Sequence, residues 1–281
     1  MKASRLIAAL TLALCFGAAL AGGRGAVRKQ IESTLLATGT VDIETDGSVS
    51  GYVLDRGGEL PKVAFELLDR ATRVWNFEPI LVAGKPVRAR TTMSIRLVAT
   101  RAGDGDGVEV RIASGNFGKL DVEGAISSVS LPPPQYPMDA ARAGVRGTVY
   151  VLVRVGRDGS VEDAVAEQVN LKVIDTEVGM DRWRQMLAKA ALRASGAWTF
   201  SPPTRGDEVD APFWIVRVPV DFVLADEKSP RYGQWVAYVP GPRQRAPWLG
   251  DIDTSLGADA VAAGSIQPLG TGPKLLTPIG G

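Results

Sequence analysis

The sequence predicts an α+β fold, and three observations carry that prediction. Stretches of alternating apolar and polar residues are typical of strands, and turns of the Asp-Gly type follow them. An amphipathic helical pattern comes after each turn. The same short motifs occur twice along the chain. The sequence therefore predicts two small strand–strand–helix–strand units followed by an irregular C-terminal tail.

Composition excludes several classes of function. The 281 residues are 45% hydrophobic and 22% charged with a net charge of +1, which gives no reason to expect nucleic-acid binding. Histidine is absent, and the one cysteine, Cys15, lies in the N-terminal apolar run. The commonest zinc sites, a Ser-His-Asp relay, a Cys-His pair and a structural disulfide all need these residues. We therefore expect no catalytic residues, no metal and no cofactor.

Residues 1–21 are predicted to be a cleaved signal peptide that exports the chain to the periplasm. Lys2 and Arg5 precede an apolar run over residues 6–21, which ends in the small-x-small site Ala19-Leu20-Ala21. At a rise of about 1.5 Å per residue the run is about 24 Å long, short of the ~30 Å hydrocarbon core. A retained inner-membrane anchor is the alternative. A lipid anchor on Cys15 is disfavoured, because the preceding leucine stands where a small residue is expected.

The two predicted units share motifs in the same order. Asp46-Gly47-Ser48-Val49 returns as Asp158-Gly159-Ser160-Val161, and Trp75-x-Phe77-x-Pro79 returns as Trp198-x-Phe200-x-Pro202. Asp-Gly between alternating apolar residues favours a hairpin, because the turn requires positive φ. The proline of the second motif explains why the preceding helix ends there. Residues 33–125 are therefore interpreted as a degenerate copy of residues 131–225.

Each element of the second unit has its own pattern. Valines at every second position over residues 149–155 predict a strand, and the Asp158-Gly159 turn leads into the next one. An apolar stripe over residues 183–194 predicts a helix. Alternation over residues 214–224 predicts the final strand, with Trp214, Val216 and Val218 on one face.

The first unit repeats this order with weaker patterns. An apolar stripe over residues 60–74 predicts a helix, with Pro61 near its start. Alternation around Ile95 predicts the last strand of the unit, and residues 108–112 are expected to add a fourth strand. From Asp226 the composition shifts to Gly, Pro, Ser and Ala, so residues 226–281 are predicted to be mostly irregular.

The second unit resembles the C-terminal domain of TonB-type energy transducers. The resemblance covers roughly 95 residues, and its motifs stand in the family's order. No single motif is specific, but the ordered set is. The motifs are Pro134-Gln135-Tyr136-Pro137, Ala141-Arg142-x-Gly144-x-x-Gly147, Arg157-Asp158-Gly159-Ser160-Val161, Trp198-x-Phe200-x-Pro202 and Val218-Pro219-Val220-x-Phe222.

This resemblance implies a periplasmic domain that binds a short peptide, the TonB box, of outer-membrane receptors. An extended peptide would be received by strand addition at an exposed sheet edge. By resemblance that edge is the last strand, residues 213–223, and the proline within it is of a kind tolerated mainly at edges. The implied peptide-binding residues are Phe213, Ile215, Arg217, Pro219, Asp221, Val223 and Tyr136.

Departures from the family change the expected role. Energy transducers keep an N-terminal anchor, usually with a functional histidine, and a long Pro-rich spacer, whereas this sequence has neither histidine nor spacer. A soluble, non-enzymatic relative that binds a receptor peptide or another envelope protein is therefore expected. A membrane-anchored transducer component with an uncleaved N-terminal helix is the alternative. An exposed edge would also allow a homodimer to form.

Four other groups of residues have both a functional and a structural interpretation. The Gly-Asp-Gly-Asp-Gly stretch at residues 103–107 lacks the further ligands of a calcium loop and favours a hairpin turn. Asp46 and Asp158 suit turn positions better than an acid–base pair. Tyr136 and Trp198 are expected to pack in the core rather than line a peptide surface. Arg154 and Arg217, on outward strand faces, are expected to be solvated.

Overall fold

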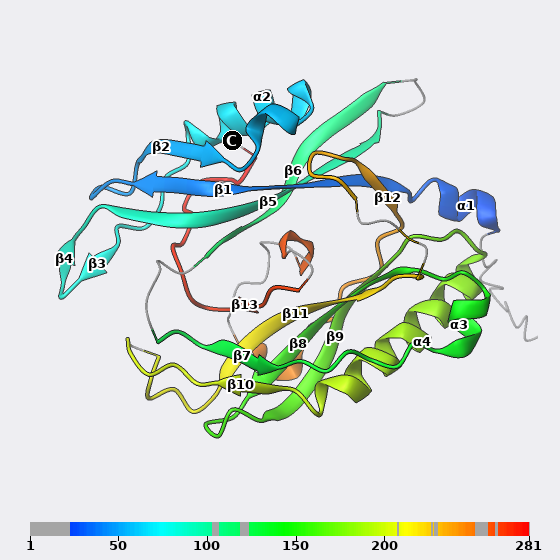
Figure 1. The fold of residues 1–281 in the computed structure, drawn as a ribbon. Helices are drawn as coiled ribbons and strands as arrows, with labels where there is room; N and C mark the ends of the chain where they lie inside the picture. Colours follow the sequence, from blue (N-terminus) through cyan, green and yellow to red (C-terminus); the bar gives the residue numbers. More distant parts are fainter. Residues whose placement is uncertain are drawn as a thin grey trace, which may run out of the picture.

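The computed structural model describes residues 23–102, 107–118, 124–206, 208–225, 227, 230–250, 258–261 and 264–280. The α+β class predicted from the sequence is confirmed, because each of two units combines a sheet with a helix (Figure 1). The expected signal peptide and most of the Gly-Asp-Gly-Asp-Gly stretch lie outside the described residues. Among the described residues, no helix has the length and apolar character needed to span a membrane.

The first unit is built around long antiparallel strands. Its elements are β1 (Glu32–Ile43), β2 (Val49–Leu54), α2 (Lys62–Thr72), the short pair β3 (Leu81–Val82) and β4 (Lys85–Pro86), β5 (Ala89–Arg101) and β6 (Val108–Phe117). The expected fourth strand is thus present as β6. It pairs with β5 along almost its whole length.

The second unit repeats this order of hairpin, helix and strand. Its elements are β7 (Ser127–Ser130), α3 (Met138–Arg142), β8 (Gly147–Val155), β9 (Val161–Leu171), α4 (Glu177–Ser195), β10 (Thr199–Ser201) and β11 (Trp214–Phe222). The N-terminal helix α1 (Arg24–Arg28) also packs here, with Val27 in the core of this unit. The tail adds the short strands β12 (Val236–Tyr238) and β13 (Gln267–Pro268).

Strand order is equivalent in the two sheets. In the first unit β1 lies between its hairpin partner β2 and the strand after the helix, β5. In the second, β8 lies between β9 and β11 in the same way. The outer edge of β5 is covered by the ten-residue strand β6, whereas the outer edge of β11 meets only the two-residue strand β13. The last strand of the second unit therefore keeps much less of its edge paired.

The two Asp-Gly turns have the same local structure. Gly47 and Gly159 adopt φ values of +87° and +81°, which a residue with a side chain rarely adopts. In each turn the aspartate carboxylate accepts the N–H of the serine two residues later, at 3.0 Å for Asp46 and 2.9 Å for Asp158. Both aspartates therefore stabilise hairpin turns, as expected from the sequence.

Each turn also contacts the Trp-x-Phe-x-Pro motif of its unit. The carbonyl oxygen of Gly47 accepts the Phe77 N–H at 2.8 Å, and that of Gly159 accepts the Phe200 N–H at the same distance. A Cβ atom on Gly47 would lie 1.9 Å from the Phe77 carbonyl oxygen, and one on Gly159 would lie 2.0 Å from that of Phe200. The two repeated motifs thus meet in space in each unit.

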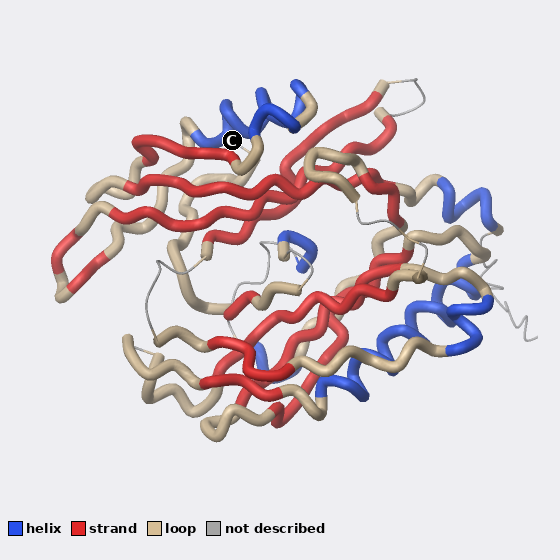
Figure 2. The backbone as a smooth tube through the Cα atoms, viewed as in Figure 1, coloured by secondary structure: helices blue, strands red, loops and turns tan. Residues whose placement is uncertain are grey.

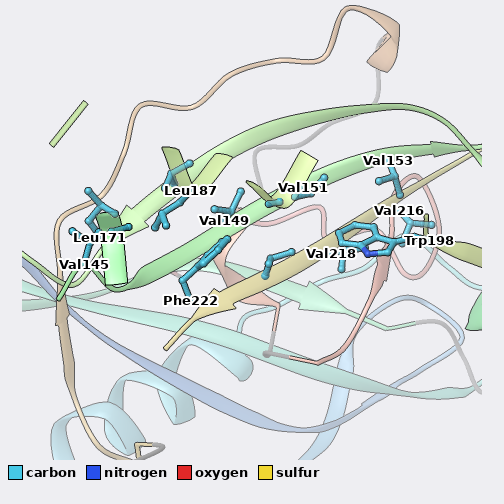
Figure 3. Close-up of a cluster of buried hydrophobic side chains, with 14 of the residues drawn as sticks. Val145, Val149, Val151, Val153, Leu171, Leu187, Trp198, Val216, Val218 and Phe222 are labelled. Carbon is cyan, nitrogen blue, oxygen red and sulfur yellow. The ribbon is translucent and has the colours of Figure 1, made fainter. Parts of the chain in front are cut away.

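Each unit has its own hydrophobic core between its sheet and its helix. In the second unit the valines of β8 and the alternate residues of β11 pack against Leu187 of α4 and against Trp198 (Figure 3). In the first unit Ala64 and Leu68 of α2 pack on β1 and β5. The apolar stripe of this helix is narrower than the sequence suggests, because Val63 is 49% exposed.

The described residues of the tail are mostly irregular, yet they pack on both units. β12 pairs with β1, and β13 pairs with β11. Ala246 and Leu249 form a buried cluster with Leu152 and Ile215 on the side of the second sheet away from α4. The alternation of apolar and polar residues in the strands of this unit predicts that one face of the sheet is buried. The tail covers the other face of the sheet as well. A Gly- and Pro-rich segment without periodicity gave no sign of this packing.

The C-terminal residues form part of the first unit. Leu275 forms an isolated bridge with Phe77, and the indole N–H of Trp75 donates to the carbonyl oxygen of Ile279 at 3.0 Å. In the second unit the segment before α3 makes the equivalent contacts. There Ser128 pairs with Phe200. The indole N–H of Trp198 donates to the carbonyl oxygen of Pro132, also at 3.0 Å.

The two sheets face each other, with the helices on the outside. α2 covers the far side of the first sheet and α4 the far side of the second, while the tail runs between them (Figures 1 and 2). Residues of β1 that point away from α2, such as Thr34 and Leu36, line the same cavity as Thr148 and Tyr150 of β8. The space between the units is therefore bounded by both sheets and the tail.

Candidate functional site

The outer edge of β11 is the candidate site, and its hydrogen-bonding groups follow from the register. The Leu269 N–H donates to the Ile215 carbonyl oxygen at 2.8 Å, across the edge that faces away from β8. Because backbone groups alternate between the two edges of a strand, the odd-numbered residues of β11 present their N–H and C=O groups to this outer edge. Four of the residues implied by the family resemblance, Ile215, Arg217, Pro219 and Asp221, occupy these positions, and Phe213 and Val223 flank the strand at its two ends.

Only part of this edge is covered by the tail. The described pairing with β13 joins Val216 to Pro268 and Arg217 to Gln267, and it goes no further along β11. Beyond this pairing lies Pro219, which has no N–H. Asp221 and Val223 are the next two odd-numbered residues. Among the described residues, the edge over positions 219–223 therefore offers two N–H donors and the intervening carbonyl groups for pairing.

The side chains of the implied site fall into two groups. Phe213 and Ile215 pack with the tail, in the cluster that contains Leu249. Asp221 is exposed and Val223 is 48% exposed. The edge is therefore buried at its start, where the tail covers it, and accessible towards its end. Whether these residues bind a peptide stays a prediction.

Arg217 is not solvated, which corrects the sequence interpretation. Its side chain is 1% exposed. Its Nε and Nη2 donate to the two carboxylate oxygens of Glu167 at 2.6 and 2.8 Å, and its Nη1 donates to Gln267 at 2.7 Å. Arg243 of the tail adds a contact of 3.3 Å to the same carboxylate. This cluster fixes the tail to the sheet and explains why β13 lies beside β11.

Few features of the sequence indicate this cluster. A charged residue at an outward strand position normally contacts water, and the tail residues that exclude water have no recognisable pattern. Glu167 is the one clue, since a buried arginine requires a buried carboxylate, and Glu167 lies on β9, which is separated from β11 by β8. Glu167 lies 50 residues before Arg217, so the pairing of these two side chains could not be predicted without the fold.

Arg154 keeps a partly exposed position, as expected. Its side chain is 32% exposed, and its Nε lies 3.0 Å from a carboxylate oxygen of Glu162, without the alignment of a hydrogen bond. Its guanidinium carbon lies 5.6 Å from the centre of the Phe213 ring. It is therefore a surface ion pair at the covered end of β11.

Tyr136 and Trp198 both pack in the second unit. The Tyr136 hydroxyl donates to the Val145 carbonyl oxygen, and its ring meets the Phe222 ring edge-on at 5.4 Å between centroids. Trp198 is 3% exposed. These contacts agree with the structural interpretation of both side chains. Tyr136 also lines an open hollow of about 570 Å³ beside α4, so a contact with peptide stays a prediction.

The two turn aspartates, Asp46 and Asp158, are each held within their own turn. Asp158 accepts hydrogen bonds from the backbone N–H and the hydroxyl of Ser160, and these hold its pKa below the usual value. Asp46 is held in the same way by Ser48, with the hydroxyl as the larger effect. Each carboxylate belongs to its own turn. No group of three His, Cys, Asp or Glu side chains is placed to hold a metal among the described residues.

Comparison with known sequences finds matches to the second unit. The family described as Gram-negative bacterial TonB protein C-terminal matches residues 132–224. Protein TonB of Xanthomonas campestris pv. campestris is 36% identical over 99 residues, which are 35% of this chain and 38% of that protein. Protein tonB2 of Pseudomonas aeruginosa is 34% identical over 93 residues, which are 33% of this chain and 29% of that protein. The chain thus spans less than two fifths of the length of these curated relatives.

A solved structure is also similar in part. The solution NMR structure of the Pseudomonas aeruginosa TonB C-terminal domain aligns with 40% of this chain and 97% of that chain, at 20% identity and a TM-score of 0.27. The family match on the sequence contains all of the ordered motifs from Pro134 to Phe222. Residues 132–224 of this chain therefore match the TonB C-terminal domain family.

Proposed function

We propose that this protein is a non-enzymatic, TonB-like protein of the periplasm, linked to TonB-dependent transport across the outer membrane. It binds an extended peptide, the TonB box of an outer-membrane receptor or a comparable segment of another envelope protein. The peptide adds as a strand to the outer edge of β11. The observation that carries this proposal is the register of β11, in which described pairing on the outer edge ends at Arg217.

The chemistry of the accessible edge supports strand addition. Positions 221 and 223 direct their N–H and C=O groups outward, so a peptide of a few residues can form several main-chain hydrogen bonds. Such bonds do not depend on peptide side chains, and the side chains beside them, Asp221 and Val223, are exposed and leave the edge accessible. The short strand β13 shows that this edge accepts an irregular, Pro-containing segment in antiparallel pairing.

A backbone NMR titration of the full mature chain with synthetic TonB-box peptides tests the proposal. We expect saturable shifts at residues 219–223 and small shifts at the outer edge of β9, where the tail already pairs with Leu171. Shifts confined to β9 or to α4 would show that the peptide binds elsewhere. A scrambled peptide of the same composition controls for binding by charge alone.

Mass spectrometry of the protein from the cell envelope tests its placement. A mature N-terminus at Gly22 supports a soluble periplasmic protein. A chain that keeps residues 1–21 supports the alternative of a membrane-anchored transducer component. Sedimentation of the free protein shows whether two copies pair through the same edge, and added TonB-box peptide would then dissociate the dimer.

A further inference from the structure

A hollow on the outer side of the second unit lies between the segment that leads into α3 and the helix α4 (Figure 1). It is open to solvent and has a volume of about 570 Å³. Residues 135–138 form one wall, and α4 forms the other. None of the lining residues lies on β11, so the hollow is separate from the edge at which the peptide of the proposed function would add.

One continuous face of α4 lines the hollow. The lining residues of this helix stand three or four positions apart, which places them on one side of it. At a rise of about 1.5 Å per residue, the stripe from Arg182 to Arg193 is about 16 Å long. An extended segment of about five residues has the same length. The α4 residues concerned are Arg182, Gln185, Met186, Lys189, Ala190 and Arg193.

The lining carries positive charge. Arg182, Lys189 and Arg193 are all exposed, and the described lining contains no carboxylate. Like charges four residues apart on a helix repel each other, so Lys189 and Arg193 weaken α4 slightly unless an anion lies near them. The hollow therefore suits acidic groups.

The nearest carboxylates along the chain do not neutralise these cations. Asp139 and Asp181 lie outside the lining, and Asp181 pairs with Arg184 at 3.2 Å. The guanidinium carbon of Arg182 instead lies 5.2 Å from the centre of the Trp183 ring. In the described part of the chain, none of the three lining cations forms an ion pair, so all three can contact an acidic partner.

The less exposed part of the lining is apolar. Tyr136, Pro137, Met186 and Ala190 are half-buried, and Met138 at the opening is 61% exposed. Methionine side chains adapt to different partners, because they are flexible and polarisable. A partner that supplied only charge would leave this surface in contact with water, whereas apolar side chains would cover it.

The spacing of the charges indicates a chain rather than a small anion. Arg182 and Lys189 are seven residues apart, which is about 10 Å along the helix, whereas the hydrogen bonds of one carboxylate reach only about 3 Å. Several acidic groups on one molecule are therefore needed to contact all three cations. A flat membrane surface would meet the exposed cations but would not enter the hollow and cover its half-buried side chains.

We propose that this hollow binds an acidic segment of a partner protein, extended over about five residues, in which carboxylate and apolar side chains alternate. Successive side chains of an extended segment point in opposite directions, so one set can meet the cations of α4 while the other covers Tyr136 and Met186. The complementary charges select an acidic partner. This surface is additional to the β11 edge, and neither proposal requires the other.

Fluorescence anisotropy of the full mature chain with a labelled six-residue peptide of alternating glutamate and leucine tests the proposal. We expect saturable binding that weakens as the salt concentration rises. A peptide with glutamine in place of glutamate should bind at least about tenfold more weakly, because it makes no ion pairs. A peptide with serine in place of leucine should also bind more weakly, because it leaves the apolar surface uncovered.

Two variants of α4 locate the binding. The double variant Lys189→Gln, Arg193→Gln changes exposed positions only, so the fold should persist, and binding should weaken about tenfold, the effect of two partly exposed ion pairs. Gln185→Glu adds a carboxylate to the lining and keeps all three cations, and it should also weaken binding.

The matched control is the double variant Arg28→Gln, Lys29→Gln. It removes one arginine and one lysine from exposed positions at the end of α1, outside the hollow, so the net charge changes equally. The control should bind the glutamate–leucine peptide as the unchanged chain does.

Four results would overturn the proposal. The peptide does not bind at concentrations up to about 1 mM. The serine peptide binds as tightly as the leucine peptide, or the α4 double variant binds as tightly as the control. In sedimentation with phosphatidylglycerol vesicles, the chain binds the vesicles through Lys189 and Arg193 but does not bind the peptide, which would assign these cations to a membrane surface. Binding of the peptide is lost in Asp221→Pro but kept in the α4 double variant, which would assign it to the β11 edge.

Discussion

The indole N–H of Trp75 donates to the carbonyl oxygen of Ile279, 204 residues later in the chain. Trp198 makes the equivalent bond to Pro132, only 66 residues before it. The first unit therefore takes from the C-terminus the segment that the second unit takes from the residues before its first helix. The end of the tail is a structural part of the first unit.

This relationship predicts that the C-terminus stabilises the first unit. Ile279 packs on Gly115 and Ile95, so Ile279→Ala should lower the free energy of unfolding by about 1–2 kcal/mol, less than for a fully buried residue. Removing residues 274–281 should cost more, because the buried indole of Trp75 also loses its acceptor. Urea unfolding followed by tryptophan fluorescence measures both. Leu276→Ala, at a side chain 54% exposed, is the control and should change little.

Breaking the Arg217–Glu167 pair should be strongly destabilising. Arg217→Met leaves a carboxylate that is 3% exposed without its two main hydrogen bonds, which typically costs about 3–5 kcal/mol. Arg154→Met removes a partly exposed pair and should cost less than about 1 kcal/mol. Chemical denaturation of the two variants compares them. Equal losses of unfolding free energy in the two variants would show that the buried pair stabilises the protein no more than the exposed pair does.

The double variant Arg217→Met, Glu167→Met distinguishes the contribution of the ion pair from the cost of burying one unpaired charge. It should recover part of the loss, because no uncompensated charge remains in the interior. A double variant as unstable as Arg217→Met alone would mean that lost packing, and not the buried charge, causes the effect.

Substitution of a turn glycine should lower the free energy of unfolding for two reasons, backbone strain and a steric clash. Gly159→Ala adds the strain of positive φ and a Cβ 2.0 Å from the Phe200 carbonyl oxygen, so the turn and the start of β10 must separate. We expect a loss above about 2 kcal/mol. At Gly144, φ is +67° but no atom lies within 4 Å of the Cβ position, so Gly144→Ala should show the backbone cost alone. Thermal unfolding of both proteins gives the comparison.

Asp158 should give the second unit a dependence on acid pH. The backbone N–H and hydroxyl of Ser160 lower its pKa below the ordinary 3.8. The stabilisation is therefore complete above the pKa of the unfolded chain, and it is lost as pH falls through the lower folded value. Ser160→Ala should move the pKa of Asp158 upward, towards 3.8. Carboxyl NMR titration measures this, and Ser48→Ala, in the other turn, should leave Asp158 unaffected.

The elements of each unit could be predicted because their signals are local. Alternation in β8 and β11, the apolar stripe of α4 and the Asp-Gly turns need no information from distant residues. The same holds for β6, which was expected from a short alternating segment after a turn. The ordered motifs were enough to indicate the family that matches residues 132–224.

The covering of the sheet by the tail could not be predicted, because it depends on contacts between distant residues. Ala246 and Leu249 lie in a segment without strand or helix periodicity, yet they bury Leu152 and Ile215. The burial of Arg217 follows from that cover. For the same reason the sequence indicated the outer edge of β11 as a candidate site but not the part that β13 covers.

Strand addition at the β11 edge is tested most directly by one backbone substitution. Asp221→Pro removes a single outward N–H at an edge that already contains Pro219, so the fold should persist. Asp221→Ala removes the same carboxylate but keeps the N–H. Fluorescence anisotropy with a labelled TonB-box peptide should show near-normal affinity for Asp221→Ala and at least about tenfold weaker binding for Asp221→Pro. Equal affinity of the two variants would contradict peptide binding by strand addition at this edge.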